Sequence, residues 1–330
     1  MSPRAKPVAT RARASRRASV LEQPRSAPLA TTDGSGTPAD RLGVRKTYKL
    51  YIGGAFPRTE SGRAYEVLDA RGRLLANACR GTRKDIRNAV RAARKAFPGW
   101  AARTAFNRSQ ILYRIAELME GRRDQFIAEV VAAEGASRRR STRLVDAAID
   151  RWVWYAGWAD KYSQSLGTVN PVGGPYFNFS VPEPTGVVGV IAPEASSLLG
   201  LVSRLAPVIV SGNAAAVVAS ESRPLPAVTL TEVLATSDVP GGVVNLITGL
   251  RRELVQHLAG HMDVNGLDAF GADPAQGAAI EELATENVKR LVRPPAGGEA
   301  GVDWLSPRAQ SPYLISEFVE TKTVWHPIGA

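Results

Sequence analysis

A short apolar run decides the fold: residues 186–191 read GVVGVI. Two runs of the same kind follow, AAAVVA at residues 214–219 and VVNLI at residues 243–247. Helix-length segments at residues 198–210 and 226–237 separate the three runs. The runs are almost wholly apolar, and such strands are buried on both faces, which is typical of parallel strands covered by helices on each side. The sequence therefore predicts strands and helices alternating around a parallel sheet.

A fourth helix and strand, expected at residues 253–258 and 266–270, extend this pattern. The fold class that we predict is α/β, with a doubly wound, Rossmann-like domain. Such domains bind nucleotides at the carboxyl ends of their strands. The G-x-G-x-x-G fingerprint of many dinucleotide-binding domains is absent from this section, so a nucleotide site needs other support.

The section before this domain is predicted to be mainly helical. Residues 48–52 alternate as a strand, and residues 67–79 form another extended stretch. A helix is expected to begin after Thr82, where the apolar period changes, and to stop at Pro98. Further helices are expected at residues 107–121, 123–135 and 142–162.

Regularity falls after Phe270. A helix is expected at residues 278–292, and residues 293–312 read as a loop because Pro and Gly are frequent there. We therefore expect an irregular remnant at residues 273–312, followed at residues 313–330 by a segment rich in strand-forming side chains.

The chain has 330 residues, of which 44% are hydrophobic and 22% charged, an ordinary composition for a globular protein. The 42 Lys and Arg against 31 Asp and Glu give a net charge of +11. Residues 1–46 carry ten of these basic side chains, three acidic ones and no aromatic residue. Such a segment cannot bury enough apolar surface to offset its ordering entropy. We predict a disordered basic arm that could contact an acidic partner.

The single cysteine, Cys79, excludes a disulfide within the chain and a zinc site built on several cysteines. Cys79 is interpreted as a small, inert hydrophobic residue. Because there are three histidines in all, no metal site is predicted, and His257 and His261 are interpreted as a solvated pair. The most apolar stretch, residues 198–219, is interrupted by Arg204, so no membrane span is predicted and a cytoplasmic location is expected.

Arg83, Arg87, Arg91 and Lys95 recur at every fourth residue and therefore share one helix face. The favoured interpretation is a solvated face. The alternative is a docking face for an acidic partner or a nucleic acid, since clustered cations attract phosphates and carboxylates.

Several short motifs carry a resemblance to a known family. They are EPTGVVGVIAP at 183–193, LAP at 205–207, SGN at 211–213, PGGVVNLITG at 240–249, YAGWADK at 155–161 and YIGG at 51–54. In this order and spacing they resemble the aldehyde dehydrogenase superfamily. The resemblance implies an NAD-binding domain at residues 47–272, with an N-terminal helical part and an oligomerisation hairpin at about 163–182. It also implies that residues 313–330 hold the family's C-terminal oligomerisation strand.

The family's reaction uses a cysteine thiolate that attacks the aldehyde, a hydride transfer to NAD(P) and a glutamate that activates water. Beyond Cys79 the sequence has no cysteine, and the Gly297-Gly298-Glu299 run is a poor substitute for the family's Glu-Leu-Gly-Gly motif. Ala195 stands where the family has its oxyanion asparagine, and alanine has no side-chain donor. The resemblance thus implies that most of the catalytic domain is absent, and no catalytic residue is assigned.

The resemblance assigns a degenerate NAD(P) site to Glu221, Pro193 and Phe270. Glu221 matches the glutamate that holds the adenosine ribose, whereas the lysine of that motif is replaced by Val218. After Phe270 the family's Gly-Ser-Thr-Glu turn becomes Gly-Ala-Asp-Pro, which would place the carboxylate of Asp273 near the pyrophosphate.

The favoured function is a non-catalytic (pseudoenzyme) subunit that assembles with a full-length aldehyde dehydrogenase paralogue, or with itself, as a dimer or tetramer. One alternative is an NAD(P)-dependent aldehyde oxidoreductase with atypical residues. The other is a nucleic-acid-binding or scaffold protein that acts through its basic arm.

Overall fold

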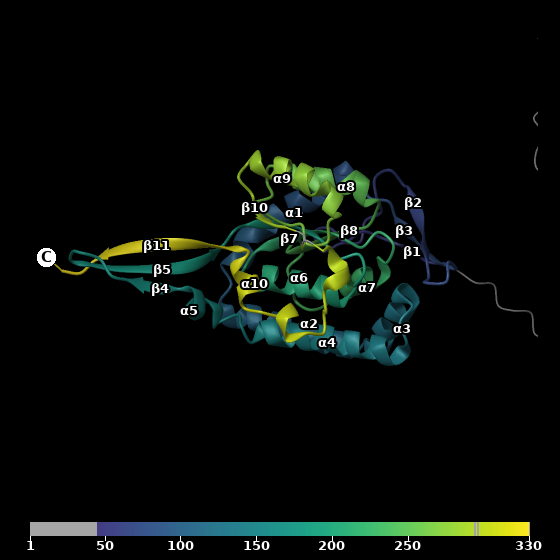
Figure 1. The fold of residues 1–330 in the computed structure, drawn as a ribbon, viewed down its shortest axis with the longest axis horizontal. Helices are drawn as coiled ribbons and strands as arrows, with labels where there is room; N and C mark the ends of the chain where they lie inside the picture. The colour runs from purple at the N-terminus through teal and green to yellow at the C-terminus, as the bar shows by residue number, and fades with distance from the viewer. Residues whose placement is uncertain (1–44, 294, 296, 330) are drawn as a thin grey trace, which may run out of the picture. The chain divides into compact units, whose positions relative to one another are not determined.

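The computed structural model of the protein, drawn in Figure 1, describes residues 45–293, 295 and 297–329. The basic arm expected at residues 1–46 lies outside the described residues, except for Arg45 and Lys46. Lys46 forms an exposed ion pair with Glu232 at 3.0 Å. The arm therefore stays a prediction from sequence.

Parallel strands form the central sheet, as the apolar runs predicted. In the described residues the sheet has five strands in the order β10-β9-β6-β7-β8, and every neighbouring pair is parallel. The strands are β6 (Val187–Ile191), β7 (Ala214–Val218), β8 (Val244–Ile247), β9 (Gly266–Asp268) and β10 (Arg290–Val292). All residues of β6, β7 and β8 are buried, which explains why their sequences show no polar alternation.

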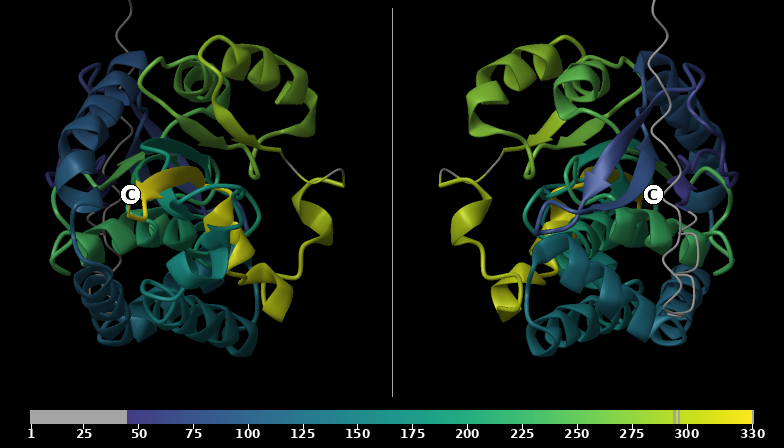
Figure 2. Two further views of the ribbon diagram at one scale, coloured as in Figure 1. Left: turned by 90° about the vertical axis from the view of Figure 1, so that its left-hand side faces the viewer. Right: turned by 90° about the vertical axis from the view of Figure 1, so that its right-hand side faces the viewer.

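Helices cover both faces of the sheet (Figure 1, Figure 2). On one side lie α1 (Arg83–Ala101), α8 (Arg251–Ala259) and α9 (Gly277–Thr285). On the other lie α2 (Ala105–Glu120), α3 (Arg123–Glu134), α4 (Arg138–Ala156), α6 (Leu199–Val210) and α7 (Leu225–Leu234). Alternate residues of β6 divide between the two cores: Val188 and Val190 join the second side, whereas Val187 and Ile191 join the first. Within the described part of the chain, no helix is both long and apolar enough to cross a membrane.

The strand order reverses beside β6. The chain runs from β6 through β7 to β8 in one direction and then returns to place β9 on the other side of β6. The loops that leave the carboxyl ends of β6 and β9 therefore diverge. In open α/β sheets this divergence creates a crevice in which ligands bind.

A second, three-stranded sheet projects as a ribbon from the body formed by the helices and the central sheet (Figure 1). It consists of β4 (Thr168–Asn170), β5 (Tyr176–Pro184) and β11 (Val319–Pro327), all antiparallel. β11 pairs with the whole length of β5, from Val319 opposite Pro184 to Pro327 opposite Tyr176. The hairpin expected at about 163–182 and the strand expected within 313–330 therefore form one sheet. Two short helices, α5 (Tyr162–Leu166) and α10 (Tyr313–Ser316), precede β4 and β11.

The single extended stretch expected at residues 67–79 is in fact parts of two strands, which belong to a third, small sheet. These residues belong to β2 (Ala64–Leu68) and β3 (Leu74–Cys79), which pair antiparallel, while β1 (Thr47–Tyr48) pairs with β3. The carboxylate of Asp69 accepts hydrogen bonds from the backbone N–H groups of Arg71 and Arg73, each at 2.8 Å. This local bonding stabilises a turn that the apolar pattern does not reveal.

Pro98 does not end helix α1, contrary to the expectation from sequence. The helix continues to Ala101 with Pro98 inside it. Trp100, which is fully buried, donates its indole N–H to the backbone oxygen of Ile209 on α6 at 2.9 Å. This packing against α6 compensates the hydrogen bond that Pro98 cannot donate.

Two further expected elements have different limits. The helix expected at residues 142–162 begins earlier, after Ser137, and ends at Ala156. The helix expected at residues 278–292 ends at Thr285, Val288 has a φ of 53°, and β10 follows. Residues 273–312, expected to be irregular apart from that helix, thus also contain an edge strand of the sheet.

Candidate functional site

A crevice of about 550 Å³ lies at the carboxyl ends of the central strands. Its walls come from the loops after β6, β7 and β9, from the first residues of α8, and from Glu299. This is the edge of the sheet at which doubly wound domains hold their ligands. The lining residues are Glu194, Glu221, Ser222, Arg251, Arg252, Val255, Gly271, Ala272, Asp273, Pro274, Gln276 and Glu299.

Glu194 follows β6 and joins two of the loops that form the crevice. Its carboxylate accepts hydrogen bonds from the backbone N–H groups of Glu221 and Ser222, at 2.9 and 2.8 Å, and from the Ser222 hydroxyl at 2.6 Å. Burial raises the pKa of Glu194, but the charge of Arg251 and these hydrogen bonds outweigh it, so the pKa lies below its ordinary value. Glu194 is therefore an anion held in place by the loop after β7.

Glu299 binds backbone N–H groups of the loop after β6, as Glu194 binds those of the loop after β7. Its carboxylate accepts hydrogen bonds from the backbone N–H groups of Glu194, at 2.8 Å, and Ala195, at 2.9 Å. Adjacent backbone N–H groups of this kind form a site for an anion. In this chain the anion is a carboxylate that comes from more than a hundred residues further along the sequence.

Arg251, the first residue of α8, is one of the two arginines that line the crevice. Its guanidinium donates to the backbone oxygens of Gly271, at 2.7 Å, and Ala192, and forms an ion pair with Glu194 at 3.1 Å. Its backbone N–H donates to the carboxylate of Glu221 at 2.7 Å. Gly271 is required at this close approach, because a Cβ there would overlap the backbone of Ala192.

The three residues predicted for a cofactor site do not meet in one place. Glu221 lines the crevice, but its carboxylate is engaged by the start of α8. Pro193 is buried beneath the loop after β6, where it approaches Gly200 of α6. Phe270 lines a neighbouring cavity of about 390 Å³ and packs edge-on against Trp304, with ring centroids 5.3 Å apart. Asp273, which was expected near the pyrophosphate of a dinucleotide, lines the crevice.

Sequence reasoning did not assign Glu194 or Arg251 to the site and gave Glu299 no part in it. The position of Glu194, just beyond a buried parallel strand, could have signalled it, since ligand-facing residues gather there. No local pattern marks Glu299, because its partners lie more than a hundred residues away in sequence.

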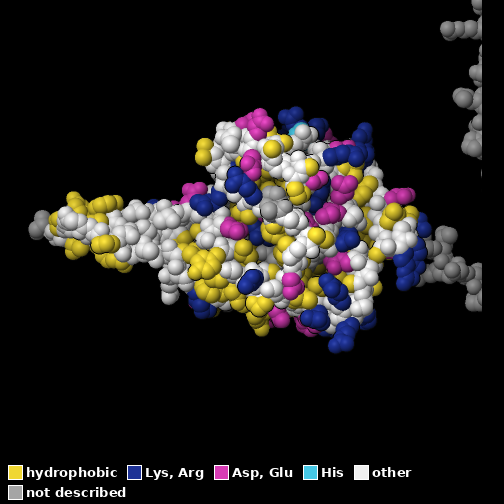
Figure 3. Space-filling view, viewed as in Figure 1, with side chains coloured by type: hydrophobic (Ala, Val, Ile, Leu, Met, Phe, Trp, Pro, Cys, Tyr) yellow, Lys and Arg dark blue, Asp and Glu magenta, His cyan; other side chains and the backbone are white. Residues whose placement is uncertain are grey.

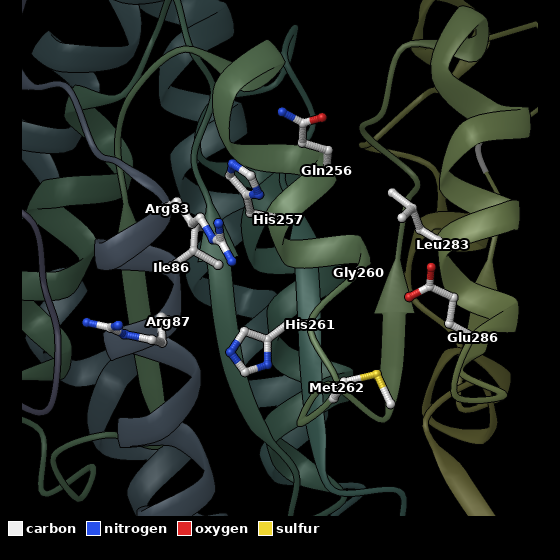
Figure 4. Close-up of a pocket in the computed structure, with 10 residues that line it drawn as sticks. All are labelled: Arg83, Ile86, Arg87, Gln256, His257, Gly260, His261, Met262, Leu283 and Glu286. Carbon is white, nitrogen blue, oxygen red and sulfur yellow. The ribbon is translucent and has the colours of Figure 1, made fainter.

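The remaining candidates lie outside the crevice. Cys79 is a buried free cysteine near the end of β3. His257 and His261 line a separate cavity between α1 and α8 (Figure 4). Over the described ranges, no cluster of three or more His, Cys, Asp or Glu side chains could hold a metal ion.

Comparisons with known proteins decide the family. Residues 57–300 match the sequence model of the aldehyde dehydrogenase family. The chain belongs to this family. It is 31% identical over 273 residues to the mitochondrial benzaldehyde dehydrogenase of Antirrhinum majus, a match that covers 82% of this chain and 48% of the relative. It is 32% identical over 256 residues to the mitochondrial aldehyde dehydrogenase family 2 member B4 of Arabidopsis thaliana, covering 76% of this chain and 47% of that protein.

The fold agrees with solved aldehyde dehydrogenases. The structure superimposes on the NAD⁺ complex of an aldehyde dehydrogenase from Bacillus cereus with a TM-score of 0.71 and 26% identity, over 74% of this chain and 50% of that one. The chain therefore spans about half the length of the relatives that it matches.

A buried charge cluster holds β11, the last strand of the described residues, against the body of this aldehyde dehydrogenase family member. Arg204 of α6 donates to Asp268 of β9 at 2.6 Å and to Glu317 at 2.9 Å. Asp268 has no exposed side-chain surface and Arg204 only 4%. The Arg204 guanidinium also lies 4.9 Å from the centre of the Phe270 ring. This cluster fastens the segment before β11 to the central sheet, close to the crevice.

Proposed function

We propose that this chain is a non-catalytic member of the aldehyde dehydrogenase family that assembles with another chain of the family through its three-stranded ribbon. The partner is a full-length family member or a second copy of this chain. The observation that carries the proposal is the crevice whose anion-binding groups are occupied by Glu194 and Glu299. We place this assembly in the cytoplasm, as expected from the sequence.

The crevice residues do not fit a dinucleotide. Four carboxylates line it, those of Glu194, Glu221, Asp273 and Glu299, against the guanidiniums of Arg251 and Arg252. The Arg251 guanidinium already forms an ion pair with Glu194 and donates hydrogen bonds to two backbone oxygens. A pyrophosphate brings two more negative charges, which the surplus of carboxylates would repel. Displacing Glu299 would free two backbone donors, but it would also leave that carboxylate to be solvated elsewhere.

The chain's own residues also offer no route to the family's chemistry. The one cysteine of the sequence, Cys79, is buried in a different sheet from the crevice strands. Nucleophilic catalysis needs a thiolate within reach of the substrate and a donor to stabilise the developing oxyanion. At position 195 the side chain is a methyl group, and the backbone N–H donates to Glu299.

The ribbon has the features of an assembly surface. Hydrophobic side chains gather at its free end (Figure 3). The exposed fractions of its large apolar residues are 70% for Val169, 43% for Tyr176, 44% for Phe177, 59% for Trp325 and 56% for Ile328, which follows β11. β11 is an edge strand of nine residues, so its outer backbone groups can pair with a further strand. Exposed aromatic residues beside an open strand edge are typical of a surface that another chain covers.

We expect NAD⁺ at about 1 mM to leave the thermal unfolding midpoint unchanged, because the crevice repels the pyrophosphate. A ligand present at ten times its Kd would add about 1.4 kcal/mol to the free energy of unfolding and raise the midpoint by a few degrees. Thermal unfolding followed by fluorescence checks this, with the Bacillus cereus enzyme as the control that should shift. A saturable rise in this chain's midpoint, or turnover of NAD(P)⁺ with an aldehyde, would contradict the proposal.

A further inference from the structure

A second cavity, lined by other residues of α8 than those that line the crevice, is built mainly from basic and apolar residues (Figure 4). Its volume is about 480 Å³. Arg83 and Arg87 come from α1, His257 from α8, and His261 from the turn after it. The full lining is Arg83, Ile86, Arg87, Gln256, His257, Gly260, His261, Met262, Leu283 and Glu286.

The two arginines of the cavity lack acidic partners in the described part of the chain. Neither Arg83 nor Arg87 forms an ion pair there. In Figure 4 the Arg83 guanidinium lies beside His257, whereas Arg87 extends away from His261. Burial, and then the charge of Arg83, lower the pKa of His257. Uncompensated positive potential of this kind favours an anion.

His261 can donate a hydrogen bond through Nε2 when its ring is neutral. The backbone N–H of Asp263 donates to Nδ1 of His261 at 3.1 Å, so in the neutral ring the proton is on Nε2. Burial lowers the pKa of His261, Asp263 raises it and Lys289 lowers it again, with a net decrease. A ligand anion could therefore receive hydrogen bonds from Arg83, His257 and His261.

The other lining groups limit the rest of the ligand. Ile86, Leu283 and Met262 supply apolar surface beside the cations. Glu286 lies on the opposite wall with Leu283, so an anionic group is confined to the side formed by α1 and α8 (Figure 4). The site thus suits a molecule with one compact anion and an apolar body.

We propose that this cavity binds a small phosphate ester with an apolar body. Phosphate matches a guanidinium and two imidazole donors better than a carboxylate does, because it presents three acceptor oxygens and up to two charges. The inference does not depend on the proposed assembly function. It also changes the interpretation of His257 and His261, which the sequence suggested to be a solvated pair.

Phenyl phosphate, phenol and inorganic phosphate, titrated by calorimetry into the full chain, test this inference. We expect saturable binding of phenyl phosphate, weaker binding of inorganic phosphate and none of phenol. Arg83→Gln and His257→Gln should each weaken the binding of phenyl phosphate by about tenfold, equivalent to 1.4 kcal/mol. Arg91→Gln, on the same exposed helix face but outside the cavity, should change binding by less than about twofold.

Nuclear magnetic resonance gives a second readout. Saturation with phenyl phosphate should raise the pKa of His257 and His261, because a bound anion stabilises their protonated forms. The groups that face these rings without ligand are Arg83 at His257, and Asp263 and Lys289 at His261. Circular dichroism would verify that each variant folds.

Three outcomes would overturn the inference. The first is no saturable binding of phenyl phosphate. The second is an equal effect of Arg91→Gln and Arg83→Gln, which would show diffuse attraction by the whole helix face. The third is much tighter binding of a phosphotyrosine peptide than of phenyl phosphate, which would identify the ligand as a segment of another protein.

Discussion

Replacing Arg204 by methionine is expected to lower the free energy of unfolding by about 3–5 kcal/mol, because it leaves a buried carboxylate without its cation. Asp268 is completely buried, and Arg204 is its ion-pair partner at 2.6 Å. Burial lowers the pKa of Arg204, but Asp268 and Glu317 outweigh it and keep the guanidinium charged. Chemical unfolding followed by circular dichroism measures the loss.

Lys322→Met is the matched control, since it removes a cation from an exposed pair with Glu183. Its expected cost is below about 1 kcal/mol. Adding Asp268→Asn to Arg204→Met should recover part of the loss, because the uncompensated charge is then gone. If Arg204→Met were no more costly than Lys322→Met, the cluster would not be what fastens the last strand to the sheet.

Replacing Phe177 and Trp325 by serine is expected to abolish assembly through the ribbon at micromolar concentrations. The two side chains lie on opposite faces of the ribbon, because Trp325 pairs with Asn178, the neighbour of Phe177. Both are exposed in the isolated chain. Interface hot spots, among which aromatic residues are enriched, contribute at least about 2 kcal/mol each, so replacing two of them should weaken association by roughly a thousandfold. Sedimentation velocity measures the change.

Tyr313→Ser is the control for this pair. Tyr313 is an aromatic residue of α10, outside the ribbon, and it is 72% exposed. Its replacement should leave association unchanged. Equal weakening by Tyr313→Ser and by the ribbon variant would place the interface elsewhere on the chain.

Much of the central fold could be predicted from sequence because strands that are buried on both faces appear as short, nearly continuous apolar runs. β6 and β7 are apolar throughout, β8 is apolar except for Asn245, and each was expected within one residue of its limits. β10 was missed because its residues were assigned to the helix expected at residues 278–292. As the edge strand it is short and begins with an exposed arginine, so it lacks the apolar run that marks the inner strands.

The site was harder to predict because its contacts are long-range. Glu221 and Asp273 were found through the family resemblance, and both line the crevice. Glu299 meets Ala195 across 104 residues, and Arg204 meets Glu317 across 113. Periodicity and capping report only neighbours within a few residues. Contacts of this range appear once the chain is folded.

The native molar mass tests the central claim most directly. It would be measured by light scattering on the chain alone and after co-expression with a full-length aldehyde dehydrogenase from the same genome, each with the native ribbon and with the Phe177 and Trp325 replacements. The account predicts a homomeric or mixed oligomer with the native ribbon and a single chain with the altered one. A monomeric mass for the native chain, both alone and in the mixture, would contradict it.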